Sequence, residues 1–244
     1  MRIEYRKHYS TFLGKEMEYK IYGHGGKPVI FIPCQGGRFY DFENSKMVDQ
    51  WAQWIDSGRC TVFSVDCIDE IAWGAVGADN RWRIENHERW YCYVTEEFIP
   101  SVRYESGRND ILAFGCSMGA MHAANLLFRR PDLFDGVFAI SGVYDSLYFF
   151  GDYMDDLLYD NSPVHYLSNM HPEHPYISLY KQRKILIVVG QGRWEEETID
   201  STRRLEHVLV QKNIPAQFAY WGYDVDHDWP WWFKMCDVYV PQLL

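Results

Sequence analysis

The sequence predicts an α/β fold in which a mostly parallel sheet carries helices on both of its faces. Two observations predict it: short apolar runs typical of buried strands alternate with longer segments of helical periodicity, and 47% of the 244 residues are hydrophobic, enough to bury a sizeable core. The chain shows no internal repeat and no linker. We therefore expect a single domain over residues 1–244.

The strands are expected in the following order. An antiparallel hairpin opens the chain, with Ile3–Tyr9 and Met17–Tyr22 on either side of a turn that contains Gly14. The first strand of the parallel sheet is expected at Pro28–Ile32, and it runs into a glycine-rich loop, PCQGG, at 33–37. The remaining strands are expected at Cys60–Val65, Ile111–Gly115, Gly136–Ile140, Lys184–Val189 and Ala216–Trp221.

Helices are expected between these strands. Large apolar residues at helical spacing predict one over 45–57. After a loop at 66–80, a longer helix is expected over 81–104, with a kink at Pro100 because proline cannot make the regular helical hydrogen bond. The segment 143–180 is rich in aromatic residues and is expected to be irregular. Further helices are expected at Met118–Arg130, Thr198–Lys212 and Pro230–Val240.

Composition and charge narrow the class of partner. The formal net charge is −10, and an acidic surface repels phosphates, so we expect no nucleic acid and no anionic membrane as partner. The first residues, MRIEY, lack the apolar run of a signal peptide, and no stretch approaches the ~20 apolar residues that span a bilayer, so a cytoplasmic location is expected. The six cysteines show no CxxC spacing and are expected to be reduced. The spacing of His165, His171 and His174 matches no standard zinc pattern, so no metal is expected.

One short motif indicates the chemistry. The segment 115–119, GCSMG, fits G-x-S-x-G and lies between an expected strand and an expected helix, where this motif presents a nucleophilic serine. Glycines are needed there because side chains at those positions would collide with the neighbouring strand and helix. The sharp turn would direct the Ser117 hydroxyl out of the sheet. The alternative is a plain helix cap, since serine is a good N-cap residue.

A serine hydroxyl is a weak nucleophile and needs a neighbouring base. His227 is the candidate, because it lies between the last expected strand and the terminal helix, where the chain order serine, acid, histidine places the base. His122 lies five residues after Ser117, an offset that turns it away from the serine on a helix, so it is expected to pack in the interior.

The acid that would orient the base has several candidates. It should follow the strand at Lys184–Val189, where the chain offers Glu195, Glu196 and Glu197. Glu195 is preferred because it comes first after the turn, whereas the next two glutamates suit the first turn of a helix. Asp145, which follows the previous strand, remains an alternative.

Two backbone N–H groups are expected to form an oxyanion hole. One belongs to Met118, at the start of a helix directly after the serine. The second should come from the glycine-rich loop after the first parallel strand, with Gln35 preferred and Gly36 as the second choice.

With these pieces placed, the chain resembles the Putative esterase family of α/β-hydrolases, in the branch of the esterase D-like and mycolyltransferase-like enzymes. The matching residues are 33–43 (PCQGGRFYDFE), 115–120 (GCSMGA), 130–134 (RPDLF), 141–142 (SG) and 227–232 (HDWPWW). The resemblance implies the α/β-hydrolase fold and a Ser–acid–His triad that works without metal. By position, Ser117 and His227 match the family's serine and histidine. Many relatives have Asp as the acid, where this chain offers Glu195 after Trp194, and Cys34-Gln35-Gly36-Gly37 replaces the His-Gly of many oxyanion loops.

The resemblance also places residues 143–180 where such folds insert a cap over the site. Its tyrosines, phenylalanines and aspartates suit an uncharged ester with an aromatic or sugar group, unless the aromatics only pack against one another. Candidate substrate-binding residues are Arg38, Gly36, Tyr144 and Trp194. Arg38 would either orient a substrate carboxylate or pair with Asp41 or Glu43 as a surface brace.

The predicted function is hydrolysis of a small-molecule carboxylic ester through an acyl-enzyme, without a cofactor. An acyltransferase with the same triad stays open, because only the exclusion of water distinguishes the two. A catalytically inactive hydrolase fold that serves as a binding protein is a third alternative. The sequence leaves open the physiological ester and the formation of a homo-oligomer.

Overall fold

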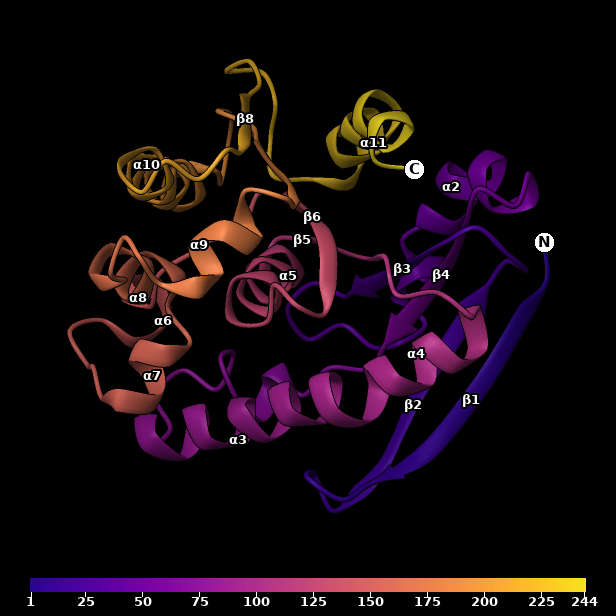
Figure 1. Ribbon diagram of the computed structural model, residues 1–244, viewed down its shortest axis with the longest axis horizontal. Helices are drawn as coiled ribbons and strands as arrows, with labels where there is room; N and C mark the ends of the chain where they lie inside the picture. The colour runs from indigo at the N-terminus through magenta and orange to yellow at the C-terminus, as the bar shows by residue number, and fades with distance from the viewer.

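The computed structural model describes residues 1–244 and contains one eight-stranded sheet (Figure 1). The order across the sheet is β1-β2-β4-β3-β5-β6-β7-β8; β1 and β2 run antiparallel, and β3 to β8 run parallel to one another. The strands are β1 (Ile3–Ser10), β2 (Lys15–Tyr22), β3 (Lys27–Ile32), β4 (Cys60–Val65), β5 (Ile111–Cys116), β6 (Phe134–Ile140), β7 (Lys184–Val189) and β8 (Gln217–Tyr220). The predicted fold class, a mostly parallel sheet after an antiparallel hairpin, is confirmed.

Helices cover both faces of this sheet. On one face α2 and α11 lie side by side (Figure 1), while α3, α4, α5 and α10 pack on the other. The helices are α1 (Asp41–Asn44), α2 (Met47–Asp56), α3 (Asn80–Cys92), α4 (Ile99–Ser106), α5 (Met118–Arg129), α6 (Leu147–Phe150), α7 (Asp156–Asp160), α8 (Pro163–Asn169), α9 (Pro175–Tyr180), α10 (Glu196–Gln211) and α11 (Trp229–Leu243). None of them is long and apolar enough to cross a membrane.

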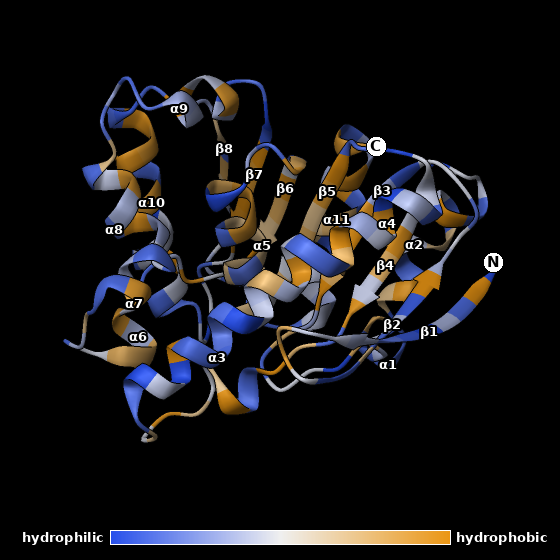
Figure 2. Ribbon diagram, turned by 60° about the horizontal axis from the view of Figure 1, so that its bottom comes forward, coloured by the Kyte–Doolittle hydropathy of each residue, from blue (hydrophilic) through white to orange (hydrophobic).

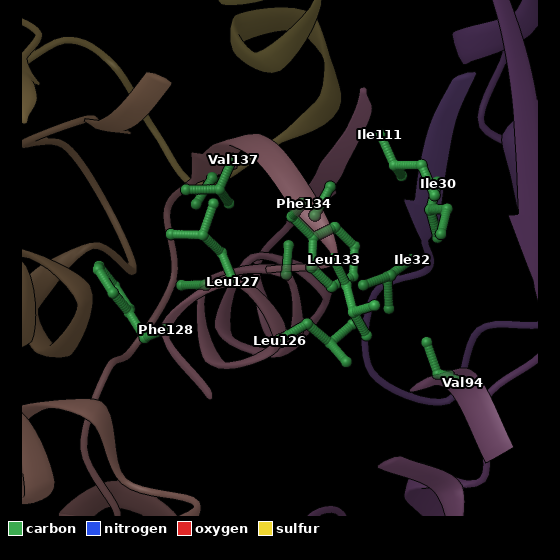
Figure 3. Packing of buried hydrophobic residues seen from close by; sticks show 14 of the residues in the cluster. Ile30, Ile32, Val94, Ile111, Leu126, Leu127, Phe128, Leu133, Phe134 and Val137 are labelled. Atoms are coloured by element: carbon green, nitrogen blue, oxygen red, sulfur yellow. The ribbon is translucent and has the colours of Figure 1, made fainter. Parts of the chain in front are cut away.

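The two faces of the sheet bury two separate groups of apolar side chains. Successive residues of a strand point to opposite faces, so in β3 Ile30 and Ile32 join the larger core while Val29 and Phe31 join the smaller one. Figure 3 shows the larger core, where Leu126 and Leu127 of α5 pack against the sheet. Strands that are covered on both faces must be apolar throughout, which is why the central strands are hydrophobic along most of their length in Figure 2.

The helix expected over 81–104 differs from its prediction. It comprises α3, a π-helical segment at Tyr93–Phe98, and α4. The ring of Pro100 would collide with the carbonyl of Glu96, four residues earlier, in a regular α-helix. The wider turns of the π-helix lie there, so the irregularity comes before the proline rather than at it.

The expectation that residues 143–180 are irregular was wrong. The segment contains the four short helices α6 to α9, which are too short to show a helical period in the sequence. Local signals mark their starts instead. The Asp155 carboxylate accepts a hydrogen bond from the Leu158 N–H to cap α7, and Pro163 and Pro175 occupy the first turns of α8 and α9.

Candidate active site

Ser117 occupies the sharp turn between β5 and α5. Its backbone has φ 55° and ψ −125°, a conformation that residues other than glycine rarely adopt. The Ser117 N–H donates to the Ile140 carbonyl at 2.8 Å, which ties the turn to the end of β6. The side chain makes no capping hydrogen bond to α5, so the alternative of a plain helix cap has no support in the geometry.

The two motif glycines are required by close backbone packing on either side of Ser117. A Cβ atom on Gly115 would lie 2.3 Å from the Gly119 carbonyl carbon. One on Gly119 would lie 2.2 Å from the Ile32 carbonyl oxygen, because α5 starts directly against the end of β3. Any side chain at these positions would push the strand, the turn and the helix apart.

His227 and Glu195 reach Ser117 from distant parts of the chain. The Nε2 atom of His227 lies 2.9 Å from Ser117 Oγ, and its Nδ1 atom lies 3.1 Å from Glu195 Oε2. Glu195 is 0% exposed. The three residues follow β8, β7 and β5, whose carboxyl ends meet at one edge of the parallel sheet. The structure therefore brings together the three residues that the sequence singled out as nucleophile, base and acid.

The buried Glu195 carboxylate is satisfied by hydroxyl groups as well as by the histidine. Thr198 donates its hydroxyl to Oε2, and Ser141 donates its hydroxyl to Oε1 at 2.5 Å. The Ser141 hydroxyl in turn accepts a hydrogen bond from the Trp232 indole at 3.2 Å. Buried charge is costly unless it is hydrogen-bonded, so these donors stabilise the carboxylate. Sequence reasoning did not select Ser141 or Trp232 as site residues, although both lie in matching segments of the family resemblance.

The alternative acids do not contact His227. The Asp145 carboxylate accepts from the Ser201 hydroxyl at 2.7 Å and the Arg204 guanidinium at 2.9 Å. Glu196 and Glu197 lie in the first turn of α10, the position that the sequence analysis predicted for them as helix residues.

The remaining candidate histidine is also engaged elsewhere. His122 is buried, with Nε2 2.8 Å from Asp69 Oδ1, and its ring stacks on His87. No group of three or more His, Cys, Asp and Glu side chains is placed to hold a metal ion.

A cavity of about 330 Å³ opens beside the Ser117 hydroxyl. Met118 and Gln35 both line it, and their backbone N–H groups donate to no acceptor within the protein. Two free donors beside a serine hydroxyl are what an oxyanion hole requires. Tyr148 and Phe149 of α6 also line the cavity.

Of the predicted substrate-binding residues, some line the cavity and others do not. Trp194 lines the cavity, is 67% exposed and has φ 63°. Tyr144 is fully buried and, like Gly36, does not line the cavity.

For Arg38, the predicted pairing with Asp41 or Glu43 was wrong. Its guanidinium binds the Asp66 carboxylate through two hydrogen bonds of 2.7 and 3.0 Å and also contacts Glu18 at 3.1 Å. It therefore pairs with neither Asp41 nor Glu43. Arg38 does not line the cavity.

Two thiols lie close to Ser117, in the neighbouring loop and in the motif itself. Burial raises the pKa of the Cys34 thiol to about 12, and it raises the pKa of the Cys116 thiol well above its usual range. Neither thiol ionises near neutral pH, so neither competes with Ser117 as a nucleophile. All six cysteines are free thiols.

Fold and site together define the class of protein. The site has a serine on a strained strand-to-helix turn, and this serine lies within hydrogen-bond distance of a histidine that contacts a buried carboxylate. The protein is a serine esterase-type hydrolase with the α/β-hydrolase fold. The family comparison is more specific. The model of the family described as "Putative esterase" matches residues 10–237, and the chain belongs to this family. No curated protein matches the chain.

Solved structures of esterases and hydrolases share the fold at low sequence identity. A ferulic acid esterase matches with a TM-score of 0.77 and 15% identity, over 99% of this chain and 97% of its own. An S-formylglutathione hydrolase from Agrobacterium tumefaciens has a TM-score of 0.74 and 14% identity, over 99% and 94%. The fluorophosphonate-binding serine hydrolase FphF from Staphylococcus aureus has a TM-score of 0.68 and 15% identity, over 99% and 98%.

Proposed function

We propose that this protein hydrolyses small-molecule carboxylic esters through an acyl-enzyme on Ser117, with His227 as general base and Glu195 as the acid that orients it. Membership of the esterase family supports ester hydrolysis. The observation that carries the finer proposal is the continuous line of contacts from Ser117 Oγ through both nitrogens of His227 to the buried carboxylate of Glu195. This line supplies what a serine hydroxyl needs to act as a nucleophile.

In the first half-reaction, Ser117 Oγ forms a bond to the carbonyl carbon of the ester while His227 Nε2 takes the hydroxyl proton. Glu195 stabilises the imidazolium that results. The N–H groups of Met118 and Gln35 stabilise the oxyanion, an effect of about 10²–10³ in rate for each donor. When the tetrahedral intermediate collapses, the ester C–O bond breaks and His227 gives its proton to the leaving alcohol.

In the second half-reaction, water takes the place of the alcohol. His227 accepts a proton from the water as its oxygen attacks the acyl carbon, and the same N–H groups stabilise the second oxyanion. Collapse of this intermediate breaks the bond to Ser117, whose oxygen regains the proton from His227. The carboxylic acid then leaves, and the enzyme returns to its starting state.

The proposal treats residues 1–244 as one catalytic domain and residues 143–180 as its cap. Val143, Tyr148 and Phe149 line the cavity, so the first part of this segment would contact the substrate. None of the residues of α7, α8 or α9 lines the cavity, so these helices would support the wall rather than form it.

The first experiment measures hydrolysis of p-nitrophenyl acetate and butyrate, together with labelling by a fluorophosphonate probe. Ser117→Ala is expected to abolish labelling and to lower kcat by about 10⁴-fold or more, and His227→Ala to lower kcat comparably. Glu195→Gln should lower kcat by about 10³–10⁴-fold, because the base loses its orienting charge. Asp145→Asn and the surface change Ser57→Ala are the matched controls and should keep kcat.

The outcomes separate the alternatives. Folded wild-type protein that neither hydrolyses the esters nor reacts with the probe would contradict the proposal and favour a binding protein. Labelling at Ser117 without hydrolysis would assign acyl transfer to an acceptor other than water. Loss of activity in Asp145→Asn, with activity kept in Glu195→Gln, would move the acid to the end of β6.

A further inference from the structure

Ser141 lies in the same site as the proposed triad but has no role in the mechanism so far. It follows β6, is 0% exposed and lines the cavity beside Ser117. Its backbone has φ 55°, a positive value like that of Ser117, which residues other than glycine rarely adopt. The Ser141 N–H donates to the Val188 carbonyl at 2.8 Å, which fixes this conformation against β7.

The hydroxyl of Ser141 is held between two groups of fixed character. An indole N–H can only donate and an ionised carboxylate can only accept, so the hydroxyl accepts from Trp232 and donates to Glu195 Oε1. The ring of Trp232 also packs edge-on against His227, with centroids 4.9 Å apart at 84°. Trp232 therefore contacts both the proposed base and the residue that binds the proposed acid.

The two oxygens of Glu195 have different partners. Oε2 faces His227 and accepts from Thr198, whereas Ser141 is the one donor to Oε1. Without the Ser141 hydroxyl, a fully buried carboxylate oxygen would have no hydrogen bond, which is unfavourable for the ionised form. The carboxylate would then lose the one hydrogen bond that fixes Oε1.

The backbone at Ser141 supports a role for the hydroxyl. A glycine would adopt φ 55° without strain, and the group that a serine adds is the CH₂OH that reaches Glu195. Strained backbone conformations persist where the surrounding structure holds them, and they cluster at functional sites.

We propose that Ser141 and Trp232 are positioning residues, which hold Glu195 ionised and aligned with His227. This inference rests on the proposed function, since it concerns the same triad. The chain of contacts runs from the Trp232 indole through the Ser141 hydroxyl to Glu195, and from there through His227 to Ser117.

Removal of the Ser141 hydroxyl should affect kcat and its pH dependence rather than KM. The loss of a hydrogen bond to a buried charge is expected to lower kcat by about 10- to 100-fold. With fewer donors, the carboxylate either attracts the imidazolium more strongly or takes up a proton more readily. Activity needs neutral His227 and ionised Glu195, so both effects move the acidic limb of the pH–rate profile upward, by about half a pH unit or more.

The experiment compares Ser141→Ala, Ser141→Gly and Trp232→Phe with Ser117→Ala and wild type, in p-nitrophenyl butyrate hydrolysis across pH. Both Ser141 variants should show the lower kcat and the shifted acidic limb, with KM within about twofold of wild type. Trp232→Phe should change both quantities in the same direction by less, since it removes only the indole donor. Trp82→Phe is the matched control, because Trp82 is 45% exposed on α3 and does not line the cavity, and it should match wild type.

Several results would overturn the proposal. One is a folded Ser141→Ala protein that keeps the kcat and the pH profile of wild type. Another is a wild-type kcat in Ser141→Gly, because the residue would then have only a backbone role. A change in KM alone would make Ser141 a substrate contact. If neither Ser141 variant folds, an unshifted profile in Trp232→Phe rejects the proposal. Activity retained in Ser117→Ala would reject the proposed function itself, which separates the two failures.

Discussion

At the scale of the residue, Ser117 depends on its glycine neighbours for its place in the fold. Gly119→Ala is expected to destabilise the protein by about 3 kcal/mol or more, because the new Cβ would lie 2.2 Å from the carbonyl oxygen of Ile32 and 2.6 Å from that of Pro33. Backbone oxygens of this kind cannot rotate away, as a flexible side chain could. Urea unfolding followed by circular dichroism measures the change.

Gly25→Ala is the matched control for this prediction. A Cβ on Gly25 would meet nothing within 4 Å, and its φ lies outside the left-handed region. The substitution should therefore change the free energy of unfolding by no more than about 0.5 kcal/mol. Equal effects of the two alanines would show that close packing around the motif is not the reason for its glycines.

The site residues that could be predicted from the sequence are those whose surroundings are local or whose place follows from chain order. Ser117 has a motif between a strand and a helix, and His227 and Glu195 follow identifiable strands. Ser141 and Trp232 were missed because the hydrogen bonds from Ser141 to Glu195 and from Trp232 to Ser141 link segments far apart in the chain, which leaves no pattern in the sequence. The partner of Arg38 was missed for the same reason, since Asp66 follows β4 and becomes a neighbour only through the order of strands in the sheet.

At the scale of the element, the buried strands and the long amphipathic helices were predictable. An apolar run that is covered on both faces and a helix with one apolar face both leave a clear period in the sequence. The four helices α6 to α9 leave none, since each consists of only four to seven residues. The π-helical segment before Pro100 depends on a clash in three dimensions, of which the sequence shows only the proline.

Helix α3 carries a group that makes stability depend on pH. Burial lowers the pKa of His87 well below its usual value, and the neighbouring His122 and Arg129 act in the same direction. The unfolded chain, with an ordinary histidine pKa of about 6.5, then binds more protons than the folded protein below that pH. Above about pH 6.5, His87 costs the folded protein no stability. As the pH falls from there toward the folded-state pKa of His87, this site lowers the free energy of unfolding by about 1.4 kcal/mol per pH unit.

Urea unfolding between about pH 5 and pH 7.5 tests this prediction in wild type and in His87→Leu. The free energy of unfolding of the variant should fall less steeply toward acidic pH than that of wild type, because leucine cannot take up the proton in the unfolded state. His207→Gln changes an exposed histidine of α10 and should keep the wild-type slope. Identical slopes in wild type and His87→Leu would assign the acid sensitivity to other groups.

At the scale of the whole molecule, the negative charge of the protein should disfavour negatively charged substrates. The protein carries a net charge of −10, and a hollow of about 290 Å³ beside the site cavity is lined by Asp145, Glu197 and Asp200 against a single Arg204. Both hollows share Val143, Tyr148 and Glu197 among their linings, so they adjoin. An ester that carries a negative charge would approach an acidic surface, and salt would screen the repulsion.

We expect kcat/KM for mono-p-nitrophenyl succinate to be about tenfold lower than for p-nitrophenyl butyrate at about 20 mM NaCl, and the gap to narrow at about 300 mM. The two esters share the leaving group and differ in the charge on the acyl chain. Glu197→Gln should narrow the gap at low salt, because Glu197 lines both hollows. A preference for the charged ester that weakens with salt would contradict the prediction.

The order of strands in the sheet was the part of the architecture that the sequence did not reveal. The positions of the strands were predicted, but β3 lies between β4 and β5, and the hairpin joins the sheet through β2 beside β4. Packing between segments that are distant in the sequence determines which strands lie next to each other. The location of the site did not depend on them, because the carboxyl ends of parallel strands lie at one edge whatever their order.

The position of the proposed base on the sheet has a consequence for how the enzyme would respond to warming. His227 follows β8, a strand of four partly exposed residues at the edge, whereas Ser117 follows β5 at the fully buried centre. Edge strands open at a smaller free-energy cost than central ones. Hydrolysis would therefore stop while most of the fold is still intact, and on cooling it would return without the proposed nucleophile ever having left its place.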